Sequence, residues 1–383
     1  MNMRYVDEFR DPKKASILVE DIHRLVQHVP QARNRPLQLM EFCGGHTHTI
    51  FKYGIEQMLP ESVELVHGPG CPVCVLPMGR VDDCVAIAEC PGVIFTTFGD
   101  AMRVPGSRKS LLQAKATGAD VRMVYSPLDA LAIARDNPDR EVVFFGLGFE
   151  TTMPATALTI LAAERQRVAN FSVFCNHITT LPTIKAILDS SDMELDGFLG
   201  PGHVSMVIGT HPYHFIAGHY HKPVVIAGFE PLDILQSLWM LLKQLAERRC
   251  VVENQYARIV PEAGNIQALD AIQQVFEIRE YFEWRGLGSI DHSGVRIRDC
   301  FAGYDAERRF AVPNLSIADP KACQCGEVLK GVIKPWECKV FGRACTPETP
   351  LGSLMVSSEG ACAAYFNYGK ISAEIPAATE EVF

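Results

Sequence analysis

Cysteine is the residue type that most clearly points to chemistry in this chain, which has 13 cysteines in 383 residues. Four of them lie close together in a stretch rich in glycine and proline: Cys323, Cys325, Cys338 and Cys345. Four thiolates can hold an iron–sulfur cluster or a structural zinc ion. The Cys-x-Cys spacing is tighter than that of the usual zinc turn, so it favours a [4Fe–4S] cluster. Zinc and unliganded cysteines remain the alternatives. Cys362 is close enough to be a redox partner, a substitute ligand or an inert buried thiol.

A second pair of thiols lies in Cys71-Pro-Val-Cys74, after the stiff turn Gly68-Pro69-Gly70. A Cys-x-x-Cys pair can close and reopen a disulfide, and this setting often lowers the pKa of one thiol. No second Cys-x-x-Cys is present to complete a zinc site. The motif therefore favours a redox or metal-handling role over a structural one. We expect its loop to face the surface.

A third motif is Cys43-Gly-Gly-His46-Thr-His48. Adjacent glycines let the backbone bend sharply and let a ligand approach closely. One thiolate and two imidazoles are a suitable set for a soft transition metal such as iron. We therefore predict a metal site here, with polar histidines that serve only packing as the alternative.

A carboxylate stands in the fourth motif, Gly148-Phe-Glu150-Thr151-Thr152, just before a predicted helix. Helix N-termini favour anions and hydroxyl caps, so capping by Thr151 or Thr152 is as well supported as a catalytic role for Glu150.

Short apolar runs that end in glycine or polar turns must position these motifs. They predict eight strands: 37–42, 63–67, 93–98, 121–125, 141–145, 171–174, 196–199 and 223–227. Helical patterns lie between or after them: 107–117, 127–137, 154–166, 182–190, 232–247 and 265–282. This alternation is typical of parallel α/β sheets, and eight strands suit two small sheets better than one. Because functional residues gather at the carboxyl ends of parallel strands, we expect the motifs to share one cleft.

Composition changes near residue 286, where strand runs become rare and six of the cysteines follow. We therefore predict two α/β domains, 1–126 with the Cys43 and Cys71/Cys74 motifs and 127–250, followed by a smaller helical and cluster-binding domain, 251–383.

The charge balance of 36 basic and 45 acidic residues gives a net charge of −9, which disfavours nucleic-acid binding. No apolar run approaches the roughly 20 residues that span a bilayer. The start of the chain lacks an apolar signal stretch, so we expect a cytoplasmic protein without a membrane partner. In a reducing compartment, the cysteines are better explained by metal or redox chemistry than by a disulfide framework.

Taken together and in their order along the chain, the four motifs resemble the HypD family of [NiFe]-hydrogenase maturation factors, over about residues 4–370. The resemblance implies two α/β domains, a smaller domain with one [4Fe–4S] cluster, and a stable complex with the small chaperone HypC. On that complex an iron atom would acquire two cyanides and one carbon monoxide before delivery to the hydrogenase large subunit. HypE would supply cyanide as a thiocyanate, made from a carbamoyl group that comes from HypF.

Carried over residue by residue, the resemblance makes Cys43 the iron-binding thiolate and Cys71 with Cys74 the redox pair of the same cleft. The four later cysteines would hold the cluster. Some relatives have cysteine where this chain has Ser353, so a disulfide from that position to Cys362 is not possible here. This role is that of a redox-active scaffold rather than a turnover enzyme. The alternatives are an iron–sulfur-dependent disulfide reductase, which leaves Cys43 and His46 without a task, and a zinc-stabilised binding module.

Overall fold

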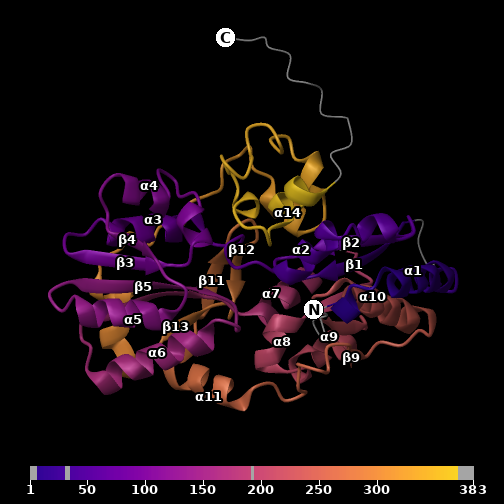
Figure 1. The fold of residues 1–383 in the computed structure, drawn as a ribbon, viewed down its shortest axis with the longest axis horizontal. Helices are drawn as coiled ribbons and strands as arrows, with labels where there is room; N and C mark the ends of the chain where they lie inside the picture. The colour runs from indigo at the N-terminus through magenta and orange to yellow at the C-terminus, as the bar shows by residue number, and fades with distance from the viewer. Residues whose placement is uncertain (1–6, 31–34, 191–193, 370–383) are drawn as a thin grey trace, which may run out of the picture.

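The computed structural model describes residues 7–30, 35–190 and 194–369. Within these ranges the chain forms two parallel β-sheets flanked by helices, and a C-terminal segment packs against both (Figure 1). The α/β class and the two parallel sheets predicted from the sequence are therefore confirmed.

The first sheet has five strands in the order β2-β1-β7-β8-β9, and all of its neighbours are parallel. Its strands are β1 (Leu37–Glu41), β2 (Val63–His67), β7 (Gly197–Pro201), β8 (Val224–Ala227) and β9 (Val252–Asn254). One face is covered by α1 (Pro12–Val26), α2 (Gly44–Lys52) and α10 (Pro231–Ala246). The other is covered by α7 (Thr180–Leu188), α8 (Gly202–Ile208) and α9 (His214–His219). Burial of both faces explains why the central strands β7 and β8 carry no polar side chain.

The second sheet has four parallel strands in the order β4-β3-β5-β6. They are β3 (Val93–Thr97), β4 (Val121–Met123), β5 (Glu141–Gly148) and β6 (Phe171–His177). The helices α3 (Met78–Ala88) and α4 (Leu111–Ala116) pack on one face. The helices α5 (Pro127–Asp136), α6 (Met153–Gln166) and α11 (Ile266–Val275) pack on the other. Figure 1 shows the second sheet on the left and the first on the right.

The two sheets are interleaved along the chain. The first takes β1 and β2 and then β7 to β9, while the second takes the four strands between them. The boundary expected at residue 126 therefore falls between β4 and β5, which belong to one sheet. The chain returns to its first sheet through the long-range pairing of β1 with β7, in which Leu39 is opposite Gly197. No local sequence pattern indicates this pairing.

All eight predicted strands are present, with ends that differ by a few residues. The helix predicted over 127–137 forms as α5 because Pro127 occupies its first turn and Ser126 and Asp129 complete a capping box. The long helix predicted over 265–282 is wrong. It ends at Val275, because the residues after it pair with β13 instead, Phe276 opposite Ile297. A partner far along the chain overrides the helical pattern there.

The C-terminal part contains two small antiparallel ladders and short helices. The ladders pair β10 (Phe276–Ile278) with β13 (Val295–Ile297) and β11 (Tyr281–Trp284) with β12 (Gly288–Asp291). The helices are α12 (Ala306–Arg309), α13 (Cys325–Leu329) and α14 (Ala361–Tyr368). A separate cluster-binding domain stays a prediction. None of the helices in the part of the chain described above is long and apolar enough to cross a membrane.

Candidate functional site

Cys43 lies just beyond the carboxyl end of β1 and is the residue that precedes α2. Strand β1 is flanked by β2 on one side and by β7 on the other, so Cys43 stands where the strand order reverses. In open parallel sheets this is where ligands bind. The Cys43 thiol is buried, and burial together with the carboxylates of Glu359 and Glu41 raises its pKa. A proton therefore stays on this sulfur until something such as a metal cation replaces it.

The loop with Cys71 and Cys74 follows β2 and lies directly against the Cys43 loop. The Gly44 N–H donates to the Gly70 carbonyl over 3.1 Å. A Cβ atom on Gly70 would overlap the backbone of Phe42 and Cys43, so glycine is required for this close approach. The structure thus brings together two motifs that are 28 positions apart in the sequence.

Cys71 and Cys74 form a disulfide in the structure, with 5.2 Å between their Cα atoms. The expectation that this loop faces the surface is wrong, since the two residues are only 4% and 1% exposed. The segment around residues 353–360 covers them. The Ser353 hydroxyl donates to the Cys74 carbonyl, and Gly360 packs against the Cys74 sulfur. Sequence spacing could not show this cover, because it comes from the far end of the chain.

His203, the second residue of α8, places its imidazole beside Cys43. Its Nδ1 lies 4.0 Å from the Cys43 Sγ, and its ring stacks on Phe229 with centroids 3.8 Å apart. His203 is itself exposed, so the buried Cys43 thiol lies next to a side chain that solvent reaches. Desolvation of the ring and the nearby His46 lower the pKa of His203, so its imidazole is neutral at pH 7. Its position after a predicted strand was a signal for this residue, but a weak one.

His46 and His48 do not join Cys43 in one ligand set. The His46 ring is buried behind the loop, where its Nε2 contacts the Ala227 carbonyl over 3.1 Å and its face meets Phe229. The His48 ring packs against Tyr368. In the described ranges no three His, Cys, Asp or Glu side chains converge so that they could hold one metal ion. Of the predicted trio, only Cys43 stands directly at the carboxyl end of β1, beside the Cys71–Cys74 loop.

Glu150 is buried at the end of β5 and serves the start of α7. Its two carboxylate oxygens accept from the Thr180 backbone N–H over 2.9 Å and from the Thr180 hydroxyl over 2.8 Å. Burial raises the pKa of Glu150 in spite of these bonds. The carboxylate thus satisfies groups at a helix N-terminus, whereas Thr152 makes no side-chain capping bond to α6. A catalytic role for Glu150 stays a prediction.

Cys325 and Cys345 belong to one buried cluster of side chains together with Cys71, Cys74 and Cys362, and the half-buried Cys323 packs against it. Cys338 is half-buried and lies outside this cluster. The sulfurs of Cys323 and Cys325 are 3.1 Å apart, and a Cβ on Gly352 would overlap both. The Leu351 N–H points at the Cys345 sulfur over 3.4 Å. Backbone donors and soft sulfurs suit the ligands of an iron–sulfur cluster. The residues therefore fit such a group by their chemistry, although the sulfurs do not converge as one tetrahedral ion requires.

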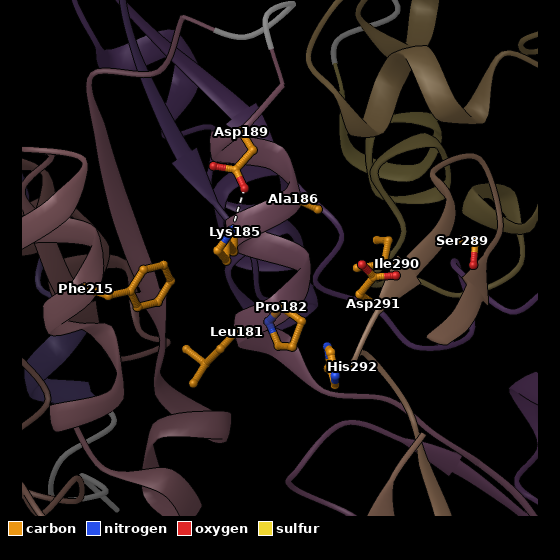
Figure 2. Close-up of a pocket in the computed structure, with 10 residues that line it drawn as sticks. All are labelled: Leu181, Pro182, Lys185, Ala186, Asp189, Phe215, Ser289, Ile290, Asp291 and His292. Carbon is orange, nitrogen blue, oxygen red and sulfur yellow. Dashed lines mark hydrogen bonds and ion pairs between the residues drawn. The ribbon is translucent and has the colours of Figure 1, made fainter. Parts of the chain in front are cut away.

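Cavity volume alone would suggest a different site from the one around Cys43. A cavity of 580 Å³ lies between α7, α9 and β12 (Figure 2). Its walls include Phe215, His292 and the Lys185–Asp189 ion pair of 2.7 Å, and none of the cysteines is among its lining residues. The thiols at the carboxyl ends of β1 and β2, rather than the residues of this cavity, are the reactive groups.

Fold and site together define a class: an α/β protein with a Cys-x-x-Cys disulfide and a further thiol at the carboxyl ends of parallel strands. Known proteins give the family. The model of the HypD family, described as the hydrogenase formation hypA family, matches residues 13–369. The hydrogenase maturation factor HypD of Rhodobacter capsulatus is 59% identical over 371 residues, 96% of this chain and 98% of the relative. That of Escherichia coli K12 is 56% identical over 372 residues, 97% of this chain and 100% of the relative. The chain therefore belongs to the HypD family of hydrogenase maturation factors.

Proposed function

We propose that this hydrogenase maturation factor is a redox-active scaffold on which an iron atom receives two cyanides and one carbon monoxide, in complex with HypC. The observation that supports this most is the direct contact between the Cys43 loop and the Cys71–Cys74 loop at one end of the first sheet. A metal-binding thiol and a two-electron dithiol are thereby neighbours. The hydrogenase large subunit would receive the finished iron group indirectly.

Cys43 is the residue that we assign to the iron cargo. A thiolate is a strong ligand for soft, low-spin iron(II) that carries cyanide and carbon monoxide. One protein thiolate leaves most coordination positions open, so a second thiolate can come from HypC. Glu359 and Glu41 surround the thiol with negative charge, which favours a cation at the sulfur over an anion.

The Cys71–Cys74 pair is the electron source that we assign to cyanide transfer. The thiocyanate of HypE, R–S–C≡N, reacts with two thiols to give R–SH, CN⁻, one proton and the Cys71–Cys74 disulfide. The S–CN bond breaks, the S–S bond forms, and two electrons pass from the dithiol to the departing cyanide. Atoms and charge balance in this step. HypF would act before it, by supplying the carbamoyl group from which the thiocyanate is made.

Cys323, Cys325, Cys338 and Cys345 are the residues that would hold a [4Fe–4S] cluster. Such a cluster supplies single electrons when bound. The chain's own contribution is to bury Cys325 and Cys345 in the same cluster of side chains as the dithiol, with Cys323 packed against that cluster.

The second candidate is an iron–sulfur-dependent disulfide reductase, which the Cys71–Cys74 disulfide favours. That function needs no thiol at position 43. The distance of 4.0 Å between Cys43 Sγ and His203 Nδ1 would serve no step of such a reductase.

The infrared spectrum of the protein isolated with HypC tests the proposal. We expect bands of bound cyanide and carbon monoxide in the wild type. Cys43→Ala and Cys43→Ser should both lose the non-cluster iron and these bands, since a hydroxyl is a poor ligand for low-spin iron. The fold should persist, because the Cys43 side chain makes no helix-capping bond. Unchanged bands in both variants would contradict the assignment, and reductase activity without any bands would favour the second candidate.

A further inference from the structure

The carboxyl ends of β1 and β2 carry a buried charged pair that the proposed chemistry does not use. We propose that Glu41 and His67 are positioning residues that hold the Cys43 loop and the Cys71–Cys74 loop in fixed register. The inference rests on the proposed function, since it assigns these two residues to the placement of its thiols.

Glu41 connects the loops through both its side chain and its backbone. The carboxylate is fully buried and accepts from the Cys43 N–H over 2.9 Å, from the Thr47 hydroxyl, and from His67 Nδ1 over 2.8 Å. The Glu41 carbonyl accepts from the Gly68 N–H over 2.8 Å. One residue therefore bonds the start of α2 on one side and the start of the Cys71–Cys74 loop on the other.

His67 is the last residue of β2 and turns toward Glu41 rather than toward solvent. Its Nε2 lies 3.4 Å from Glu56 Oε1, and its ring packs on Phe51 with centroids 4.7 Å apart. Burial by itself would lower the pKa of His67, but the two carboxylates outweigh it and raise the pKa to about 9. The ring is thus a cation at pH 7, and its bond to Glu41 is charge-assisted.

A buried ion pair is a weak source of stability, because desolvation of both charges offsets their attraction. An apolar pair would fill the space between two strand ends at least as well. What the ion pair adds is direction, since each donor fixes one lone pair of the carboxylate. The Cys43 backbone is held at a set distance from the Gly68 turn. This fixes the position of the Cys43 sulfur relative to the sulfurs of Cys71 and Cys74.

Placement of this kind matters most for a reaction between groups on separate loops. A misplacement of about 1 Å can slow such a step by as much as roughly 100-fold. We therefore expect variants at Glu41 and His67 to affect the thiols more than the fold.

The test compares Glu41→Gln, His67→Gln and His67→Phe in the full chain isolated with HypC. Asp83→Asn is the matched control, because Asp83 is a carboxylate buried in α3, where it accepts from the Asn314 N–H and lies outside the site. Three quantities are measured: the melting temperature, the intensity of the cyanide and carbon monoxide bands, and the rate at which iodoacetamide alkylates Cys43 in iron-free protein. Peptide mass spectrometry identifies the alkylated residue.

We expect Glu41→Gln and His67→Phe to lower the band intensity by about tenfold or more and to change the Cys43 alkylation rate by a similar factor. Their melting temperatures should also fall, because each variant removes one member of a buried ion pair, and Asp83→Asn shows what a loss of stability alone does to both readouts. His67→Gln retains a hydrogen-bond donor and should show a smaller effect on both readouts. If Glu41→Gln does not fold, the two His67 variants carry the test.

Bands and alkylation rates that change only in proportion to the loss of folded protein would overturn the proposal. Failure of the proposed function looks different. In that case Cys43→Ala would retain its bands, while the alkylation rate, which needs no iron, would still report whether Glu41 and His67 place the thiol.

Discussion

The seven cysteines to which we assign a role occupy two regions that are built in different ways. Cys43, Cys71 and Cys74 stand on loops whose ends are anchored in parallel strands, and backbone hydrogen bonds join those loops. The cysteines from 323 to 345 lie in a segment with one five-residue α-helix, α13, one 3-10 helix over Pro335–Glu337, and otherwise mainly turns and bends. Both regions contribute to the same buried cluster of side chains.

The difference indicates what each region depends on. The position of a strand-end loop is fixed by a sheet that is buried on both faces. The loop and its sheet should therefore stay in place when one thiol is removed. The backbone hydrogen bonds of the 323–345 segment are local turn bonds, so the segment must obtain its order from side-chain packing and from what its cysteines bind. Variants in the two regions should therefore fail in different ways.

The largest effect should follow Cys338→Ala in the C-terminal segment. Loss of one of four ligands should remove the visible absorbance near about 400 nm and lower the stability of the region after residue 286 by several kcal/mol. Iron analysis, absorbance and limited proteolysis measure this. The two sheets should remain resistant to protease, and full iron content and absorbance in the variant would remove the cluster assignment.

Cys71→Ser is the corresponding change in the strand-end region. It should abolish maturation of hydrogenase in cells, because a hydroxyl cannot form the disulfide. The cluster absorbance should persist. Since Cys71 is buried, we expect a stability loss of about 1–3 kcal/mol from the unsatisfied hydroxyl, measured by urea unfolding. Full hydrogenase activity in cells with only this variant would exclude a redox role for the pair.

A smaller effect should come from pH through His67. Its pKa in the folded protein, about 9, is above the ordinary value of 6.5, so its contribution is fully present below about pH 6.5 and is lost as pH rises through 9. The groups that face it are Glu41 and Glu56, with Lys334 near Glu56. We expect about 1–3 kcal/mol less stability at pH 10 than at pH 6 from this source. His67→Gln should flatten the curve, and parallel curves for variant and wild type would contradict the expectation.

The smallest effect should follow Glu150→Gln in the second sheet. The amide can still accept from one Thr180 donor but not from both, so α7 should lose about 1 kcal/mol. Thermal unfolding measures the loss. Normal infrared bands in this variant would assign Glu150 to the helix end, whereas their loss in a folded protein would support the catalytic role predicted from the sequence.

Much of the local structure was readable from the sequence, because strands such as 63–67 are apolar runs bounded by turn residues and helices such as α5 have their caps beside them. The strand over 276–278 was not, because its partner is near residue 296 and nothing local indicates it. The same holds for Glu41. A glutamate at the end of strand β1 is a signal of a buried charge, but its charged partner His67 comes from the next strand, 26 positions along the chain.

By itself the sequence determined the alternation of strands and helices, the motifs that follow each strand, and the grouping of four cysteines in a glycine-rich segment, since these depend on neighbours along the chain. Tertiary structure alone decided that the chain returns to its first sheet at β7, that His203 rather than His46 stands beside Cys43, and that Ser353 and Gly360 bury the dithiol. Each of these is a contact between residues far apart in the chain, and its free energy comes from packing and hydrogen bonds that no local pattern encodes.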